Sequence, residues 1–447
     1  MLWWILACTI VDEPTVQPRG DVDVPTSLMD TSSTPDTGAS SHTGSPRDTG
    51  ATGHTGDTAV PMVDEALVDR CTVDIDNDEP GAPNLSRVVL SEGRCNDGTP
   101  PTAYVRAATD PAHQNEWLLY FEGGYSCGTG ESCSIRWCGE DFHDAQKMSS
   151  TWSTEGKRKD GLLSVDAAND FAGWNIVFMP YCSSDEWAGT RSDVVLTNDD
   201  GVRFRVHFEG ARIVDGLFDA LEVGVSSDDG LEVLPPLVEA ERVVLSGGSG
   251  GAKGVMHNLD AVAERLAPIE VVGLLEGATM PTDPYLTPAQ IDLVNDYNAS
   301  TYGAAHASWG SRLDASCVTD NPLEPWRCIE PRVLQHESLS TPYFLHHDLR
   351  DRVLIDVFDQ VAGIDGATFA TGSKRALEDL GAARPGVGVH GSVCAEHVSF
   401  LNSRLMQDQF LPVDGVALSL HDAIVRWLDG HAVVAVDDPA APLSTCP

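Results

Sequence analysis

Ser249 and its glycine neighbours are the residues of this sequence best suited to chemistry. Residues 247–251 read Gly-Gly-Ser-Gly-Gly and contain Gly-x-Ser-x-Gly, the pattern of a nucleophile elbow. The small neighbours let the backbone turn sharply, and the helix start that follows brings N–H groups near a developing oxyanion. The pattern predicts a serine esterase with Ser249 as nucleophile; the alternative is a plain glycine-rich loop.

Two nucleotide-binding motifs that also use glycine do not fit this segment. A P-loop needs Gly-Lys-Ser/Thr, whereas this chain has Ala252-Lys253-Gly254. A dinucleotide fingerprint counted from Gly248 and Gly250 needs a further glycine where Lys253 stands. No C-x-x-C pair occurs either, so a zinc ribbon is not expected. We therefore expect neither a metal nor an organic cofactor.

A serine nucleophile needs a general base and an acid that orients it. In α/β-hydrolases these residues follow the serine in the order Asp or Glu, then His. Asp348 and Asp351 both follow the strand-like run 343–345, and spacing does not choose between them. Spacing also leaves four late histidines open: His390, His397, His421 and His431.

Apolar runs and helical patterns alternate in the elements that would position these residues. Strands separated by helices indicate a mostly parallel sheet covered on both faces, with the site at the carboxyl ends of the strands. Residues 194–197 and 202–208 predict a hairpin with one solvent-facing side. The predicted strands are 88–90, 117–121, 175–179, 243–245, 271–275 and 342–345, and the predicted helices are 210–222, 252–266 and 417–428.

The N-terminal part differs in composition from the rest. Leu2–Ile10 is apolar but too short to span a bilayer, and it is typical of the end of a secretory signal. Leu6-Ala7-Cys8 resembles a lipobox, which predicts lipidation of Cys8 unless this is a chance cysteine. We therefore predict a signal segment (1–8), a disordered Thr/Ser/Gly/Pro/Asp-rich tether (9–62) and one folded domain (63–447).

Charge and cysteine content limit the partners and the compartment. The formal net charge is −40, with 5 Lys against 23 Arg, which argues against nucleic-acid binding. Asp74–Asp78 has a calcium-like rhythm, but Glu79 and Leu85 occupy places that need Gly and Glu, so an acidic surface loop is expected. An even set of ten further cysteines predicts disulfides and an oxidising compartment. They are Cys71, Cys95, Cys127, Cys133, Cys138, Cys182, Cys317, Cys328, Cys394 and Cys446.

Ordered motifs recur over most of residues 93–400. They are Cys95–Pro100, Trp117–Gly124 followed by Cys127, Met148–Ser150 with Gly161–Ser164, Pro180–Asp185 with Trp187 and Gly189, and Phe208–Arg212. With these motifs the chain resembles the pectin acetylesterase / Notum family of carboxylesterases, which implies an α/β-hydrolase fold.

The resemblance also implies the roles of individual residues. Ser249 matches the family nucleophile. Thr341–Phe344 matches the strand before the acid and selects Asp351, and Cys394-Ala395-Glu396-His397 matches a Cys-x-x-His that selects His397. The oxyanion hole would comprise the N–H of Gly250 and that of Gly124 or Tyr125. The implied disulfides are Cys95–Cys182, Cys127–Cys133, Cys317–Cys328 and Cys394–Cys446, leaving Cys71 and Cys138, which could pair.

The chain departs from the family pattern around the acyl site. Tyr125 stands where Gly or Trp is common, and Gly250 stands where Ala most often follows the nucleophile. Leu275–Ala278 replaces an Ala-Asp-Ser-Gly type segment. These substitutions alter one wall of the predicted acyl pocket.

Together with the N-terminal signal, the resemblance predicts an exported, monomeric serine carboxylesterase; the lipobox-like Cys8 predicts a bacterial envelope lipoprotein held to the membrane, and the alternative is an extracellular protein. We expect it to remove an acyl group, acetyl first, from a polysaccharide ester, although the negative charge suits acidic pectin poorly. The alternatives are a fatty-acyl esterase acting on protein or lipid, and a non-catalytic binding protein on a hydrolase scaffold. A general lipase would need an apolar tunnel, for which the candidate residues are Phe171, Trp174, Trp187, Trp309 and Trp326.

Overall fold

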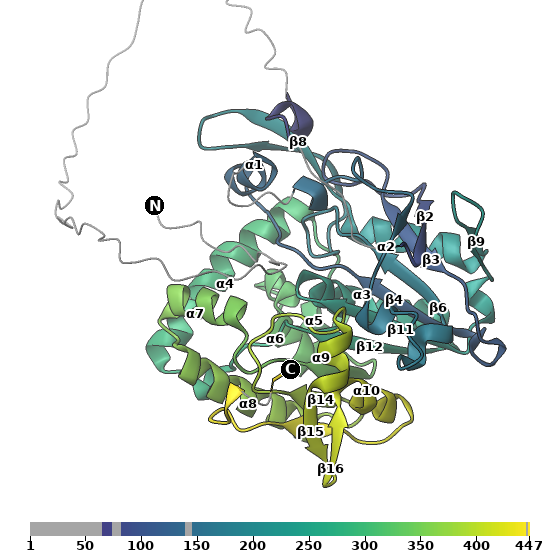
Figure 1. Ribbon diagram of the computed structural model, residues 1–447. Coiled ribbons are helices and arrows are strands. Elements are labelled where there is room, and N and C mark those ends of the chain that lie inside the picture. Colours follow the sequence, from purple (N-terminus) through teal and green to yellow (C-terminus); the bar gives the residue numbers. More distant parts are fainter. Residues whose placement is uncertain (1–64, 74–81, 139–144, 444–445) are drawn as a thin grey trace, which may run out of the picture. The chain divides into compact units, whose positions relative to one another are not determined.

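A computed structural model describes residues 65–73, 82–138, 145–443 and 446–447 (Figure 1). Cys8, the 9–62 tether and the acidic loop 74–78 lie outside the described residues, as does the 62/63 boundary. Within the described part of the chain, no helix is long and apolar enough to cross a membrane.

A ten-stranded sheet forms the centre of the fold, in the order β17-β14-β13-β12-β11-β4-β6-β3-β2-β5. The strands from β17 to β6 run parallel, and β3, β2 and β5 continue the sheet antiparallel. Most residues of the central strands are buried, as expected for parallel strands covered on both faces. The strands are β2 (Leu85–Val89), β3 (Thr102–Arg106), β4 (Glu116–Phe121), β5 (Gly156–Lys157), β6 (Asn175–Met179), β11 (Arg242–Gly248), β12 (Glu270–Glu276), β13 (Tyr343–His346), β14 (Gly388–Gly391) and β17 (Val434–Val436).

Helices cover both faces of this sheet because alternate strand residues point to opposite sides. Trp117 and Leu119 of β4 pack with α2 (Gly210–Glu222), α3 (Gly250–Leu266) and α8 (Gly366–Ala383). Leu118 lies on the other side with α9 (Ser403–Asp408) and α10 (Leu420–Leu428). The predicted α/β fold with a mostly parallel sheet is confirmed.

Smaller elements complete the structure. A separate sheet joins β1 (Glu65–Ala66), β8 (Arg203–Phe208) and β7 (Arg191–Thr197), and two hairpins join β9 (Val225–Ser226) to β10 (Val233–Leu234) and β15 (Phe410–Val413) to β16 (Val416–Ser419). The other helices are α1 (Gly130–Cys138), α4 (Pro288–Trp309), α5 (Ala315–Asp320), α6 (Pro331–Val333) and α7 (Arg352–Ala362).

Two sequence-based expectations need correction. The helix predicted from residue 417 begins at Leu420, because residues 416–419 pair with β15 as strand β16 and Ser419 caps the helix. The predicted hairpin is present as β7 and β8, but the face that was expected to be solvent-exposed is partly buried. His207 is buried there, and its Nδ1 accepts the N–H of Asp193 at 3.3 Å.

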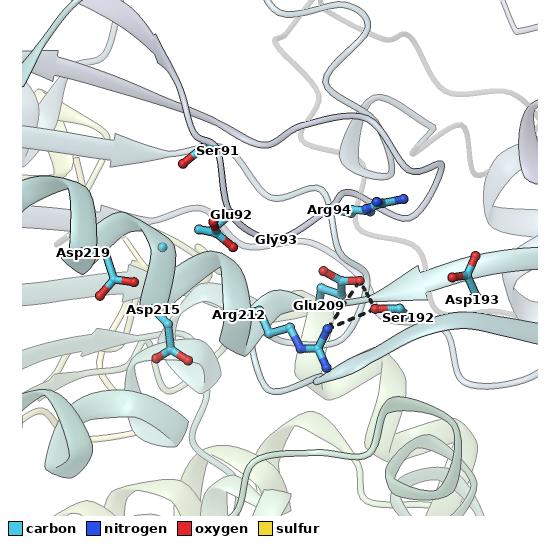
Figure 2. A pocket seen from close by; sticks show the side chains of 11 residues that line it. Ser91, Glu92, Gly93, Arg94, Ser192, Asp193, Glu209, Arg212, Asp215 and Asp219 are labelled. Carbon is cyan, nitrogen blue, oxygen red and sulfur yellow. Dashed lines mark hydrogen bonds and ion pairs between the residues drawn. The ribbon is translucent and has the colours of Figure 1, made fainter.

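A polar cavity of about 450 Å³ lies beside α2 and the start of β7 (Figure 2). In Figure 2, Arg212 and Ser192 both reach the Glu209 carboxylate. Its lining residues are Ser91, Glu92, Gly93, Arg94, Ser192, Asp193, Glu209, Arg212, Asp215, Gly216 and Asp219. Since Ser249, Asp351 and His397 are not among them, this cavity is not the candidate active site.

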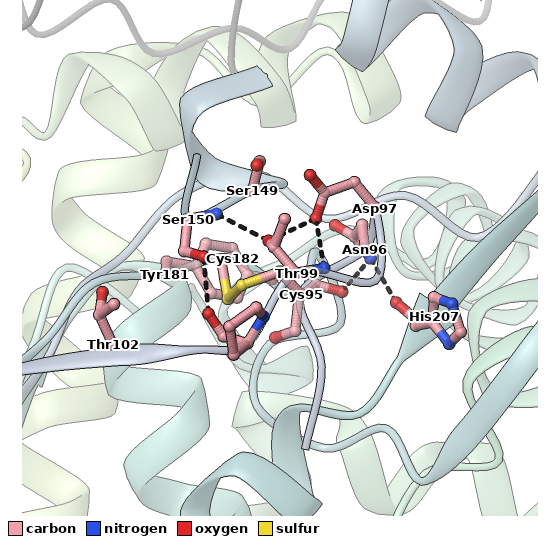
Figure 3. Close-up of a disulfide and its surroundings, with 12 residues drawn as sticks. Cys95, Asn96, Asp97, Thr99, Thr102, Ser149, Ser150, Tyr181, Cys182 and His207 are labelled. Atoms are coloured by element: carbon pink, nitrogen blue, oxygen red, sulfur yellow. Dashed lines mark hydrogen bonds between the residues drawn. A yellow bond between two sulfur atoms is a disulfide. The ribbon is translucent and has the colours of Figure 1, made fainter. Parts of the chain in front are cut away.

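Five disulfides connect the described residues: Cys71–Cys138, Cys95–Cys182, Cys127–Cys133, Cys317–Cys328 and Cys394–Cys446. The last four are the pairs that the resemblance implies. Figure 3 shows Cys95–Cys182, which links the segment before β3 to the segment after β6. Beside it, Asn96 Nδ2 donates to the carbonyl oxygens of Ser183 and His207, each at 2.6 Å. These contacts fix the 180–189 segment that packs beside the site.

Candidate active site

Ser249 occupies a strained turn between β11 and α3. Its φ is 55° and its ψ is −123°, a conformation that a non-glycine residue holds only when its surroundings impose it. Its N–H donates to the carbonyl oxygen of Glu276 at 2.9 Å, and its side chain stays partly exposed. A Cβ atom at Gly251 would lie 2.0 Å from Phe121 O, so only glycine allows this turn to pack against the end of β4.

The loop after β4 lies directly against this turn. A Cβ atom at Gly123 would lie 2.3 Å from Gly248 O and 3.1 Å from Ser249 Cβ. A Cβ atom at Gly250 would lie 2.5 Å from Gly124 O and 3.3 Å from Gly124 N. The structure thus brings Gly124 and Gly250 into contact beside Ser249, with Tyr125 next in the same loop. Peptide N–H groups at such a place suit an oxyanion hole.

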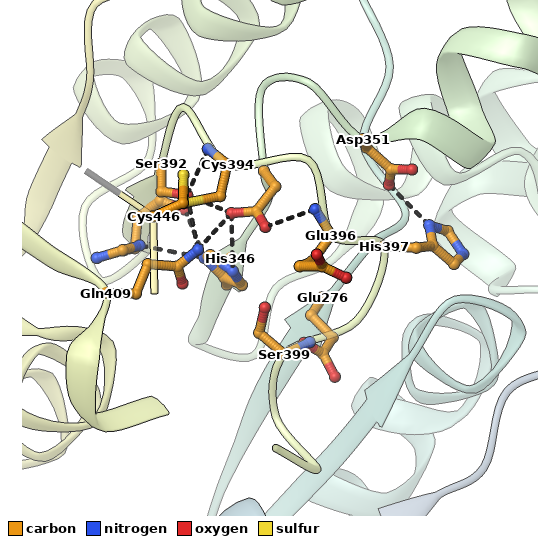
Figure 4. Close-up of polar contacts among 12 residues, drawn as sticks. Glu276, His346, Asp351, Ser392, Cys394, Glu396, His397, Ser399, Gln409 and Cys446 are labelled. Carbon is orange, nitrogen blue, oxygen red and sulfur yellow. Dashed lines mark hydrogen bonds and ion pairs between the residues drawn. A yellow bond between two sulfur atoms is a disulfide. The ribbon is translucent and has the colours of Figure 1, made fainter. Parts of the chain in front are cut away.

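Asp351 and His397 form a hydrogen-bonded pair (Figure 4). Nδ1 of His397 lies 2.7 Å from Oδ2 of Asp351, while Oδ1 accepts the N–H groups of Val353 and Leu354 at 3.0 and 3.1 Å. The Asp351 carboxylate is fully buried as the N-cap of α7, and the His397 side chain is 13% exposed. A carboxylate on Nδ1 leaves Nε2 of His397 available to exchange a proton.

The pair lies next to the nucleophile turn through Gly277. A Cβ atom at Gly277 would lie 2.3 Å from His397 O and 3.4 Å from His397 Cε1. The preceding residue, Glu276, accepts the N–H of Ser249. No hydrogen bond of the described residues joins Ser249 Oγ to His397; catalytic hydrogen bonds often tighten only when substrate binds.

Asp348, the other acid left open by spacing, has different contacts. Its Oδ1 accepts the Gln409 amide at 2.7 Å and the Ser392 hydroxyl, and its Oδ2 accepts the Glu396 N–H at 3.2 Å. Burial raises the pKa of Asp348 to about 8, although these hydrogen bonds oppose the rise. The structure therefore places Asp351, rather than Asp348, against His397.

The other late histidines have other surroundings. The His390 ring is buried 3.1 Å from His346, Nδ1 to Nδ1, and burial lowers its pKa to about 3. Nε2 of His421 accepts the N–H of Asp170 at 3.2 Å, and His431 is exposed. His390 and His421 are therefore neutral packing residues.

A partly buried ion pair behind the turn links four segments around the site. Nζ of Lys253, in the first turn of α3, donates to Glu186 Oε1 at 2.8 Å and to the Tyr302 hydroxyl of α4 at 3.3 Å. Ser126, from the loop after β4, donates to the same Glu186 oxygen at 3.1 Å. Burial lowers the pKa of Lys253, but the Glu186 carboxylate outweighs it and keeps the pKa above its ordinary value. Sequence reasoning missed this pair, because Lys253 signalled only the absence of a P-loop.

The aromatic residues considered for an acyl tunnel lie mostly in the core. Phe171, Trp174, Trp187 and Trp309 are all at most 5% exposed. The Trp187 ring stacks on Phe121 with centroids 5.1 Å apart. In the part of the chain that the structure describes, no group of three or more His, Cys, Asp or Glu could hold a metal ion.

Comparisons with known proteins identify the family and the fold. The sequence profile of the family described as Pectinacetylesterase matches residues 84–374. The palmitoleoyl-protein carboxylesterase NOTUM of Drosophila melanogaster is 30% identical over 274 residues, which are 59% of this chain and 36% of that protein. The human palmitoleoyl-protein carboxylesterase NOTUM is 33% identical over 299 residues, 64% of this chain and 54% of that protein. The chain thus spans about half, or less, of the length of these curated relatives.

The fold has a close counterpart among solved structures. The structure of the Wnt deacylase Notum from Drosophila superposes with a TM-score of 0.63 at 23% identity, covering 81% of this chain and 99% of that one. The likeness supports the α/β-hydrolase-like fold. Because the family profile matches well over half of the sequence, this chain belongs to the pectinacetylesterase family of carboxylic ester hydrolases.

Proposed function

We propose that this chain is an exported serine carboxylesterase that removes an acyl group, acetyl first, from an ester on a polysaccharide. The observation that carries the proposal is the buried Asp351–His397 hydrogen bond beside the strained turn of Ser249. Membership in the pectinacetylesterase family supports the acetyl ester. The net charge of −40 favours a neutral glycan over an acidic one.

The reaction follows from the positions of these residues. Ser249 Oγ attacks the ester carbonyl carbon while Nε2 of His397 takes the hydroxyl proton. The C=O π bond opens, and the negative charge on its oxygen accepts hydrogen bonds from Gly250 N–H and from Gly124 or Tyr125 N–H. His397 then gives its proton to the leaving alkoxide as the ester C–O bond breaks, which leaves an acyl-Ser249.

Deacylation uses the same groups. Water attacks the acyl carbon, His397 takes the water proton and returns it to Ser249 Oγ, and the carboxylic acid leaves. Asp351 holds the tautomer of His397 with a proton on Nδ1 and stabilises the imidazolium in both steps. Its two N–H donors from α7 and its full burial keep this carboxylate in one orientation.

A second candidate is a fatty-acyl esterase. Both relatives described above are named palmitoleoyl-protein carboxylesterases, and the similar solved structure is a Wnt deacylase. The two candidates differ in the length of acyl chain that the site accepts, which a chain-length series measures directly.

The test is hydrolysis of nitrophenyl esters from acetyl to palmitoyl by the full chain with its disulfides formed. Ser249→Ala should lower kcat by about 10⁴-fold or more, whereas the exposed Ser300→Ala should leave it unchanged. A rate maximum at acetyl supports the polysaccharide deacetylase, and a maximum at long chains supports the fatty-acyl enzyme. A folded, oxidised protein without activity on any ester would refute both and favour a binding protein.

We also propose that the protein acts as a monomer outside the cytoplasm and is held to the envelope through lipid on Cys8. Five disulfides support an oxidising compartment. Labelling of expressing cells with a radioactive fatty acid should mark the wild type and leave Cys8→Ser unlabelled. Equal labelling of both proteins would overturn the anchor.

A further inference from the structure

The loop that carries His397 has no regular secondary structure of its own. It runs from Ser392 to Phe400 after β14, and the Cys394–Cys446 bridge holds its first half (Figure 4). Because such a loop has no ladder of its own, its peptide groups need partners elsewhere in the fold. Two buried carboxyl groups, Glu276 and Asp348, supply such bonds on the two sides of His397.

Glu276 binds the part of the loop after His397. It is the last residue of β12, and its Oε2 accepts the N–H groups of Ser399 and Phe400 at 2.6 and 2.8 Å. Its Oε1 accepts the Tyr120 hydroxyl at 3.2 Å, and its backbone carbonyl accepts the Ser249 N–H. One residue therefore holds both the nucleophile turn and the histidine loop.

Asp348 binds the part of the loop before His397. Its Oδ2 accepts the N–H of Glu396, the residue next to His397, and its Oδ1 holds Ser392 and Gln409. Its carbonyl oxygen accepts the N–H of Asp351 at 2.9 Å. One residue therefore holds both the catalytic acid and the histidine loop.

Burial makes both carboxyl groups costly, and burial raises the pKa of each to about 8. Each is fully or almost fully buried, with further titratable groups around it: Asp351 and His346 face Asp348, Tyr120 faces Glu276, and the charge of Asp348 also acts on Glu276. An apolar residue would fill either place at lower cost. The bonds to the loop give a reason for a carboxyl group at both positions.

We propose that Glu276 and Asp348 are positioning residues that together fix His397 relative to Ser249 and Asp351. The inference rests on the proposed function for its catalytic meaning. Its structural content, the placement of the His397 ring, is measurable without any substrate.

Two variants of Glu276 distinguish the effect of its hydrogen bonds from the effect of its side-chain volume. In Glu276→Gln, one amide oxygen still accepts both loop N–H groups and the NH₂ can face Tyr120, so kcat should stay within about threefold of wild type. Glu276→Met keeps the volume but offers only a weak acceptor, so kcat should fall about 10²-fold with little change in KM. Glu270→Met, at the exposed start of the same strand, is the matched control and should not change kcat.

Variants of Asp348 test the part of the loop before His397. Here the conservative amide variant is expected to lower kcat. All the donors around its two oxygens need acceptors, and the NH₂ group that Asp348→Asn introduces would oppose one of them. Asp348→Asn should therefore lower kcat by about tenfold or more at nearly constant KM. Asp356→Asn on the exposed side of α7 is the control.

The decisive measurement is the NMR signal of the proton between His397 Nδ1 and Asp351 Oδ2, assigned by its loss in His397→Gln. It should persist in Glu276→Gln and in Ser249→Ala, and broaden or vanish in Glu276→Met and Asp348→Asn. An unchanged signal and an unchanged kcat in the latter two would overturn the proposal. If Glu276→Met does not fold, Asp348→Asn with the same two readouts decides. An inactive wild type would refute the esterase, while the NMR comparison would still test the positioning.

Discussion

A methyl group placed on Gly250 should disable the proposed oxyanion hole while leaving Ser249, Asp351 and His397 in place. The Cβ atom of Gly250→Ala would lie 2.5 Å from the carbonyl oxygen of Gly124. Carbon and oxygen atoms rest about 3.3 Å apart or more, so the Gly124 peptide, or the turn itself, must move by roughly 0.8 Å. The contact is with a backbone atom, and no flexible side chain can absorb it.

The expected effect follows from that displacement. A misplacement of about 1 Å at a reacting centre costs about 10²-fold, and loss of one oxyanion donor costs about 10²- to 10³-fold. We therefore expect kcat for nitrophenyl acetate to fall about 10²-fold, or about 2.7 kcal/mol in the activation barrier.

The assay compares Gly250→Ala with Gly303→Ala, a change on α4 where a Cβ atom would meet nothing within 4 Å. Active sites are counted by labelling Ser249 with a fluorophosphonate, so that kcat refers to correctly folded protein. Gly303→Ala should match the wild type. If Gly250→Ala keeps a third of wild-type kcat or more, the contact with Gly124 does not limit the oxyanion hole and the reasoning is wrong.

Three further predictions concern stability. The pKa of Glu276 is above its ordinary value, so its contribution to stability is full below about pH 4.5 and is lost as the pH rises to about 8. Urea unfolding between pH 6 and pH 8 should show this loss as a falling free energy of unfolding. Glu276→Gln should reduce the slope of that free energy against pH by at most about 1.4 kcal/mol per pH unit. Replacing Cys394 and Cys446 by serine opens a link with a sequence separation of 52 and should cost about 4 kcal/mol of unfolding free energy as well as activity; full activity would count against a role of this bridge in the site. Lys253→Met leaves Glu186 buried without its cation and should lower the free energy of unfolding by about 3 kcal/mol in chemical denaturation. Adding Glu186→Gln to Lys253→Met should restore part of this loss. Equal stability of the single and the double variant would refute the prediction.

Elements with a strong local signal could be predicted from the sequence. The predicted strand 175–179 and helix 210–222 coincide with β6 and α2, because a buried run and an amphipathic period of 3.6 leave little choice. β14 was missed, since a four-residue strand with glycine at both ends carries no periodicity. α4 was missed despite a usable signal: Thr287 and Gln290 form a capping box with Pro288 at the first helical position.

Within the site, too, the residues with a local signal could be predicted, and those that depend on distant contacts could not. The nucleophile turn at Ser249 is local and was recognisable from five residues. Asp348 and Asp351 follow the same strand, and only the path of the 392–400 loop decides which one meets His397. Glu276 gave no signal as a positioning residue, because the N–H groups that it accepts lie 123 and 124 positions later in the chain. Contacts between such distant segments depend on the order of strands in the sheet.

The Cys394–Cys446 bridge can form only late in synthesis, because its second cysteine lies 52 positions after the first. A nascent chain that has been synthesised beyond His397 already contains Ser249, Asp351 and His397. The bridge to the histidine loop forms only after residue 446 has been synthesised and both thiols have been oxidised. An esterase that needs this bridge would therefore become active only after oxidation of the two thiols.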